Sequence, residues 1–259
     1  MEDLKIVLIQ TSLHWEDKRA NLDMFSHKIA AINGVVDLIV LPEMFSTGFS
    51  MKASQLAEEI NGKTVTWMKD QATKSSSVVV GSLIIKEKDK CYNRLIWMRP
   101  DGNYEYYDKR HLFRLANEQD HYTGGTERKI VELNEWRINL NVCYDLRFPV
   151  WSRNRGDYDI LLNVANWPAK RSYPWKTLLK ARAIENMCYV IGLNRVGNDG
   201  NNYYHSGDSA VIKPDGETII DCSDEEKILY ATLSEDELTK FRQRFQFYKD
   251  ADNFTIAME

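Results

Sequence analysis

Apolar runs of strand type alternate with helical runs along most of this chain of 259 residues. Residues 5–10 and 37–42 are short apolar runs, whereas residues 16–33 and 64–75 repeat apolar side chains at helical spacing. A further apolar run at 78–85 has the length of a buried strand. Apolar strands separated by amphipathic helices favour an α/β fold in which helices cover a sheet.

The tripeptide Pro-Asp-Gly occurs twice, at residues 100–102 and 214–216. Proline fixes φ and glycine accepts a positive φ, so each copy predicts a hairpin. The flanking strand-like runs are residues 93–98 with 104–109 and residues 210–212 with 218–220. A strand carrying Gly81 or Gly192 precedes each hairpin by some twenty residues. This pattern predicts two similar halves that build two facing sheets, with chance similarity as the open alternative.

Two helices are expected in the second half of the chain. Residues 175–188 have helical composition and follow Pro174, which a first helical turn tolerates. Ser234 and Glu237 have the spacing of a capping box and predict a last helix over 238–245.

The chain shows no Ser/Gly-rich or Pro-rich linker, so residues 1–259 are predicted to form a single domain. Residues 247–259 carry little core pattern, and we expect them to form an arm that packs on a neighbouring subunit.

Charge and cysteine content narrow the class of protein. A formal net charge of −4 argues against nucleic acid or an anionic membrane as the main partner. The apolar runs fall short of the roughly eighteen residues that would span a bilayer. The four cysteines lie far apart without CxxC spacing, and the first residues do not resemble a secretory signal. We therefore expect reduced thiols and a cytoplasmic location.

Three strand-end segments carry groups that could be reactive. Glu43 follows the strand-like run at 37–42, Lys109 ends the first hairpin, and Cys143 follows the alternating run at 136–140. Taken singly, each has a plain alternative: a surface glutamate, a solvated Lys-Arg cluster or a structural cysteine. A thiol at a strand-to-helix elbow lies near the N-terminal dipole of the next helix, which favours the thiolate.

The other cysteines have no such elbow. Cys188 is predicted within a helix, while Cys91 and Cys222 lie beside charged residues of expected loops. We interpret all three as inert.

Taken together and in this order, the segments around Glu43, Lys109 and Cys143 resemble the nitrilase superfamily of carbon–nitrogen hydrolases. The motifs read strand-Pro-Glu, Tyr-x-Lys-x-His-Leu and Asn-x-Cys-Tyr-Asp-x-Arg-Phe-Pro. The resemblance continues through residues 163–168, 181–186, 194–197 and 207–209. It implies a four-layer α-β-β-α sandwich, which agrees with the two-sheet prediction.

The resemblance also implies a catalytic triad of Glu43, Lys109 and Cys143, with Glu118 as a second active-site glutamate. In this chemistry Glu43 accepts the thiol proton, and Lys109 favours the resulting anion. The oxyanion is then held by the Lys109 ammonium and a backbone N–H, most naturally that of Tyr144. Glu118 helps to position the hydrolytic water; its plain alternative is an exposed loop acid. No metal or organic cofactor is required.

Residues 109–113 and 166–168 look most like the omega-amidase branch, whose members deamidate monoamides of 2-oxo dicarboxylic acids such as 2-oxoglutaramate. A substrate with a remote carboxylate requires a cation in the pocket. Arg147 and Arg171 are the candidates, each with a surface ion pair as the alternative. Trp167 is expected to form an apolar wall of the pocket. By resemblance, a homodimer or larger homo-oligomer is expected.

Several alternatives stay open at this point. The chain could hydrolyse another small amide or a nitrile within the same superfamily, or it could be a catalytically silent nitrilase-like binding protein. A Cys-His hydrolase would need a histidine beside the thiol, and His205 is the one to examine. A metalloenzyme is disfavoured because no His, Cys or Asp set has ligand-like spacing.

Overall fold

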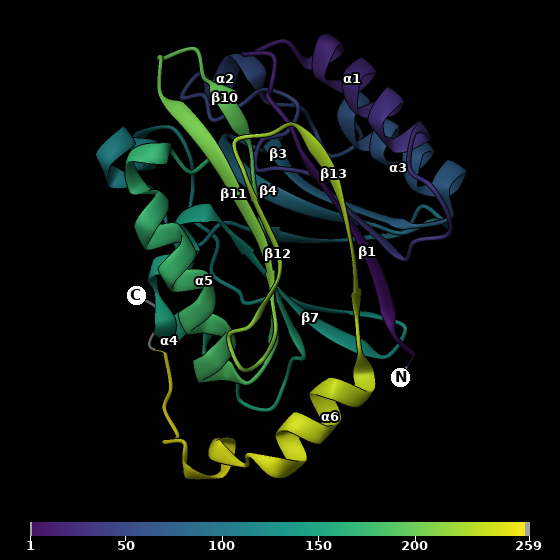
Figure 1. Cartoon of the computed structure of the whole chain (residues 1–259). Coiled ribbons are helices and arrows are strands. Elements are labelled where there is room, and N and C mark those ends of the chain that lie inside the picture. The colour runs from purple at the N-terminus through teal and green to yellow at the C-terminus, as the bar shows by residue number, and fades with distance from the viewer. Residues whose placement is uncertain (1, 257–259) are drawn as a thin grey trace.

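The computed structural model describes residues 2–256 and contains two β-sheets packed face to face, with helices on the outer face of each (Figure 1). Helices α1 (Lys18–Ala30) and α3 (Lys63–Ser75) cover one sheet, and α5 (Ser172–Asn186) covers the other (Figure 1). The predicted α-β-β-α sandwich is therefore confirmed.

The first sheet has six strands in the order β13-β1-β2-β3-β4-β5. Their bounds are β1 (Leu4–Gln10), β2 (Leu38–Val40), β3 (Val78–Glu87), β4 (Lys90–Met98), β5 (Tyr104–Asp108) and β13 (Lys227–Leu233).

The second sheet has seven strands, in the order β10-β11-β9-β8-β7-β6 with β12 paired to β11. Their bounds are β6 (Ile130–Leu133), β7 (Trp136–Val142), β8 (Ile160–Ala165), β9 (Tyr189–Asn194), β10 (Val196–Asn198), β11 (Tyr204–Ile212) and β12 (Thr218–Ser223).

The two sheets repeat one topology. In the first, β1, β2 and β3 are parallel, and the antiparallel β4 and β5 follow. In the second, β7, β8 and β9 are parallel, and the antiparallel β11 and β12 follow. The strand patterns thus match the two halves expected from the repeated Pro-Asp-Gly hairpins.

Shorter helical segments connect and flank these strands. They are α2 (Ala53–Leu56), α4 (Pro149–Ser152), α6 (Glu235–Arg244) and the 3₁₀ turns η1 (Arg114–Ala116), η2 (Glu118–Asp120), η3 (Cys143–Arg147), η4 (Ala169–Arg171) and η5 (Phe247–Asp250). Helix α6 begins as expected, because the Ser234 side chain accepts a hydrogen bond from the Glu237 backbone N–H.

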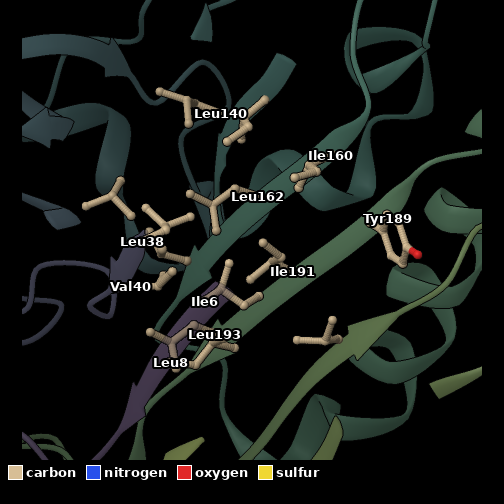
Figure 2. Close-up of a cluster of buried hydrophobic side chains, with 14 of the residues drawn as sticks. Ile6, Leu8, Leu38, Val40, Leu140, Ile160, Leu162, Tyr189, Ile191 and Leu193 are labelled. Atoms are coloured by element: carbon tan, nitrogen blue, oxygen red, sulfur yellow. The ribbon is translucent and has the colours of Figure 1, made fainter. Parts of the chain in front are cut away.

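The main hydrophobic core lies between the sheets. Side chains such as Ile6 and Val40 of the first sheet meet Leu162 and Ile191 of the second (Figure 2). On the first sheet the neighbouring residues, for example Val7 on β1, point outward into a second core under α1 and α3. On the second sheet they point into a third core under α5, as Leu161 does. Because both faces of these strands are covered, their sequences are continuously apolar.

Two sequence expectations about the cysteines were wrong in detail. Helix α5 ends at Asn186 because Met187 adopts a left-handed φ of 50°, so Cys188 lies beyond the helix, although it is buried. Cys91 and Cys222 lie in strands β4 and β12, and the charged residues near them in sequence resemble those of a loop.

The C-terminal segment packs in part on its own chain. Ile256 contacts the inter-sheet core, and the Arg155 guanidinium lies over the Phe254 ring. Phe247 and Tyr248 remain exposed. The predicted arm over 247–259 extends beyond the described residues at 257–259, and its contact with a neighbouring subunit stays a prediction.

Candidate active site

The three expected reactive residues come from strand ends of both sheets. Glu43 follows β2, Lys109 follows β5 directly, and Cys143 begins η3 at the end of β7. Backbone bonds from Leu41 and Phe45 to strand β3 hold the segment that carries Glu43. Strands β2 and β7 each lie inside a parallel set, one in each sheet. Because the two sheets pack face to face, the carboxyl ends of β2 and β7 come close together.

A buried lysine lies between two buried glutamates. The Lys109 ammonium donates to Glu43 Oε1 at 2.9 Å and to Glu118 Oε1 and Oε2 at 3.0 Å each. All three side chains are fully buried. Burial alone would lower the pKa of Lys109, but the charges of Glu118 and Glu43 raise it above its ordinary value. The ammonium therefore stays charged.

Glu118 lies behind Lys109 and does not line the cavity described below. Its Oε2 also accepts a hydrogen bond from the Phe113 backbone N–H. Burial raises the pKa of Glu118, against the opposing effect of Lys109. Its expected help in positioning a water stays a prediction, whereas its contacts with Lys109 are direct.

Two asparagines complete the surroundings of Glu43. Asn93 Nδ2 donates to Glu43 Oε1 at 2.8 Å, and the Asn166 backbone N–H donates to Glu43 Oε2 at 2.8 Å. The sequence analysis missed Asn93. Its signal was the register of the first hairpin, in which Lys109 N–H bonds to the Asn93 carbonyl at 3.0 Å.

Cys143 forms a sharp elbow with a φ of 47°, in the left-handed region that costs a non-glycine residue energy. Its pKa lies well above the ordinary value for a thiol. Burial is the largest cause, followed by the negative charge of Glu43, while Lys109 acts in the opposite direction. The thiol is therefore protonated in the resting site. The sequence expectation of a helix dipole that favours the thiolate stays a prediction, and the turn η3 that would supply it has only five residues.

The thiol and the ammonium line a cavity of about 390 Å³. Its other walls include Phe49, Met51, Phe113, Leu115, Ala116, Tyr144, Arg147, Asn166, Trp167, Pro168, Arg171, Asp199, Asn201, Tyr203 and His205. Leu115 and Tyr203 are exposed, so the cavity reaches the molecular surface on their side. This volume accommodates a small organic substrate.

All the expected substrate-binding residues reach this cavity. The Arg147 guanidinium lies over the Trp167 ring, and that of Arg171 lies over the Phe113 ring, each 5.0 Å from the centroid. Within residues 2–256, neither guanidinium has a carboxylate partner. The pKa of Arg171 is lowered, first by burial and also by the like charge of Arg147. This wall of the cavity is suited to an anion.

His205 also lines the cavity but does not activate the thiol. Its Nδ1 lies 2.9 Å from the Tyr203 carbonyl oxygen, and burial lowers its pKa to about 4. The groups that shift the pKa of the Cys143 thiol include Glu43, Lys109 and Glu118, and the charge of Arg171 also interacts with it. The geometry thus disfavours a Cys-His hydrolase.

Residues 5–243 match the model of a protein family described as carbon-nitrogen hydrolase. The chain belongs to the carbon–nitrogen hydrolase family. The chain is 48% identical to omega-amidase YafV of Escherichia coli strain K12, over 99% of this chain and all of that one. It is 32% identical to a 2-oxoglutaramate amidase of Bacillus subtilis, over 83% of this chain and 84% of that one.

Solved structures of this carbon–nitrogen hydrolase family share the fold. A superfamily member from Xanthomonas campestris, with an arsenic adduct in its active site, superposes with a TM-score of 0.97 at 45% identity and covers 99% of this chain and all of that one. Nit3 of Saccharomyces cerevisiae, a member of branch 10 of the nitrilase superfamily, gives 0.85 at 26% identity, with 94% of each chain covered. The resemblance to the nitrilase superfamily is therefore confirmed.

This carbon–nitrogen hydrolase carries neither a metal-ligand cluster nor a membrane-spanning helix within residues 2–256. No group of three or more His, Cys, Asp or Glu side chains there could hold a metal ion. No helix in the same range is long and apolar enough to cross a membrane.

Proposed function

We propose that this carbon–nitrogen hydrolase cleaves the terminal amide of a small 2-oxo dicarboxylic acid monoamide, such as 2-oxoglutaramate, to the acid and ammonia. The observation that carries this proposal is the pair Arg147 and Arg171, which have no carboxylate partner within residues 2–256 and lie on the wall of the cavity that also holds Cys143 and Lys109. The names of the Escherichia coli and Bacillus subtilis relatives support the same substrate class.

In the first half-reaction Glu43 acts as the general base. Its Oε1 already accepts bonds from Lys109 and Asn93, which leaves Oε2, with one bond from Asn166, to take the thiol proton. The sulfur of Cys143 bonds to the amide carbon as the proton moves to Glu43. Deprotonation occurs during attack because the resting thiol has a raised pKa.

The tetrahedral oxyanion would lie against the Lys109 ammonium and the Tyr144 backbone N–H. Such donors stabilise the charge that develops on the oxygen, and losing one usually costs about 10²–10³ in kcat. Glu43 then returns the proton to the amide nitrogen, the carbon–nitrogen bond breaks, and ammonia leaves a thioester on Cys143.

In the second half-reaction water hydrolyses this thioester. Glu43 accepts a proton from the water, the hydroxide oxygen bonds to the thioester carbon, and the proton returns to the departing sulfur. We propose that Glu118 supports both steps by holding Lys109, and that it assists in placing the water.

The carboxylate of the substrate would bind between Arg147 and Arg171, against the Trp167 ring. A charge-assisted hydrogen bond of this kind contributes about 1.5–3 kcal/mol. An α-ammonium beside the carboxylate, as in glutamine, would meet two like charges there. We therefore expect 2-oxo monoamides to be preferred to amino acid amides.

Ammonia release from 2-oxoglutaramate, 2-oxosuccinamate, glutamine, a simple aliphatic amide and a nitrile tests the proposal. We expect release from the 2-oxo monoamides, and Cys143→Ala should abolish it. Release from a simple amide or nitrile alone would favour the alternative, another hydrolase of the same superfamily. Release from none of them would favour a catalytically silent binding protein.

We also propose a single domain over residues 1–259, a cytoplasmic location and a homodimer or larger homo-oligomer. The exposed apolar side chains Ile184, Phe247 and Tyr248 lie near the last helix and its C-terminal extension and support self-association. Light scattering on the purified protein tests this, and a monomer at micromolar concentration would contradict it.

A further inference from the structure

The residues that flank Lys109 and Cys143 meet at one buried carboxylate. Asp145 is fully buried, two positions after the cysteine. Its Oδ2 accepts bonds from the Tyr107 hydroxyl at 2.8 Å and the Val142 backbone N–H at 3.0 Å. Its Oδ1 accepts the His111 backbone N–H at 2.9 Å and lies 2.8 Å from His111 Nδ1.

These contacts join the two sheets at the active site. Tyr107 and His111 lie two positions before and two positions after Lys109, at the end of β5. Val142 and Asp145 bracket Cys143, at the end of β7. The Asp145 side chain therefore links residues on both sides of the lysine to the residues that flank the nucleophile.

Further contacts make this junction rigid. The Tyr107 oxygen accepts bonds from Trp151 Nε1 at 3.0 Å and from the Arg110 backbone N–H at 3.2 Å. The His111 ring stacks on Phe148, with 3.7 Å between ring centroids and 7° between planes. A carboxylate that accepts four hydrogen bonds in a buried site fixes its partners closely.

We propose that Asp145 is a positioning residue, which acts through Tyr107 and His111 to set the placement of the Lys109 ammonium relative to the Cys143 sulfur. This inference rests on the proposed function for the roles of Lys109 and Cys143. Asp145 does not touch the cavity, so its effect falls on the rate of the chemical step and not on substrate binding.

Asp159 offers a matched control. It is also buried, and its carboxylate also accepts four hydrogen bonds, from the backbone and guanidinium of Arg137 and from Arg242. It ties α6 to the second sheet and lies outside the proposed active site. Asp145→Asn and Asp159→Asn remove the same charge and leave nearly the same shape.

Steady-state ammonia release separates a positioning role from a structural one. We expect Asp145→Asn to lower kcat at least about tenfold, measured per folded protein, with KM within about threefold of wild type. Asp159→Asn should keep kcat within about twofold of wild type. We expect the melting temperature to fall in both variants, because each loses a buried carboxylate. The inference is overturned if Asp145→Asn keeps kcat within twofold, or if both variants lose kcat by the same factor.

Tyr107→Phe carries the test if Asp145→Asn does not fold. It removes one bond to Asp145 and keeps the ring, and we expect kcat to fall about threefold to tenfold with KM unchanged. An unchanged kcat in Tyr107→Phe overturns the inference in that case.

Alkylation of Cys143 by iodoacetamide at pH 8 requires no substrate. The Lys109 charge lowers the pKa of the thiol, so a displaced ammonium leaves less thiolate. We expect at least threefold slower alkylation in Asp145→Asn and wild-type rates in Asp159→Asn. Equal rates in both variants and the wild type overturn the inference, whether or not 2-oxoglutaramate is the substrate. If alkylation follows the expected pattern but 2-oxoglutaramate releases no ammonia, only the proposed substrate is overturned.

Discussion

Replacing Lys109 by methionine should destabilise the protein by an amount that depends on pH. The substitution keeps an unbranched side chain but removes three hydrogen bonds, at 2.9, 3.0 and 3.0 Å, to Glu43 and Glu118. Both carboxylates are fully buried, and Asn93 remains as a donor to each, at 2.8 Å and 3.5 Å. Removing one partner of a buried ion pair usually costs about 3–5 kcal/mol.

The pH dependence follows from the two carboxylates left facing one another. One of them should take up a proton, and Glu118 is the candidate because burial already raises its pKa in the wild type. A carboxyl group with a raised pKa in the folded state stabilises the protein at low pH, and this contribution is lost as pH rises through that pKa. The deficit of Lys109→Met should therefore be largest at pH 8 and shrink toward pH 5, by at most about 1.4 kcal/mol per pH unit.

Urea unfolding at pH 5, 6, 7 and 8 measures this deficit. Lys213→Met is the control, because Lys213 forms surface ion pairs with Glu217 and Glu237 and should cost about 0.2–1 kcal/mol at every pH. The kcat of Lys109→Met should also fall about a hundredfold or more. A deficit below about 1 kcal/mol at pH 8, or one that is the same at pH 5, would refute the reasoning.

Three further substitutions test other parts of the molecule. Arg171→Gln should raise KM for 2-oxoglutaramate about tenfold or more with little change in kcat, because a charge-assisted bond contributes about 1.5–3 kcal/mol; an unchanged KM would place the carboxylate elsewhere. Gly192→Ala should lower the free energy of unfolding by about 1–3 kcal/mol, since its Cβ would lie 2.5 Å from Leu179 Cδ1. A calorimetric melt identical to wild type would contradict this. His205→Gln should retain activity within about tenfold, because the imidazole, with a pKa near 4, is neutral at neutral pH and does not contact the thiol. Complete loss of ammonia release in the folded variant would revive the Cys-His alternative.

Much of the fold follows from patterns that are local in sequence. The apolar runs at β1, β2 and β3 were predictable because strands buried on both faces are formed mostly by apolar side chains. The Pro-Asp-Gly turns predicted both hairpins, but the register of the first hairpin, which sets Asn93 beside Lys109, was seen only in the structure. The end of α5 was not predictable, because it depends on a left-handed Met187 that composition does not reveal.

The catalytic candidates Glu43, Lys109 and Cys143 were also predictable from the sequence, because each follows a strand and the motifs resemble those of a known family. The distances between them were not predictable. Strand pairing within the first sheet brings Glu43 and Lys109 together, and Cys143 reaches them because the second sheet packs against the first.

The sequence by itself indicated the apolar strands, the amphipathic helices and the chemical groups that stand at the strand ends. The tertiary structure alone decided the protonation of the thiol and the pairing of Lys109 with two glutamates. It also decided that Arg147 and Arg171 line the cavity without a carboxylate partner among the described residues. The physical reason is that periodicity acts between near neighbours, whereas desolvation and Coulomb interactions depend on what surrounds a group in space. The tertiary structure also decided the position of Asp145 between Tyr107, His111 and Val142, because these contacts join segments more than thirty residues apart.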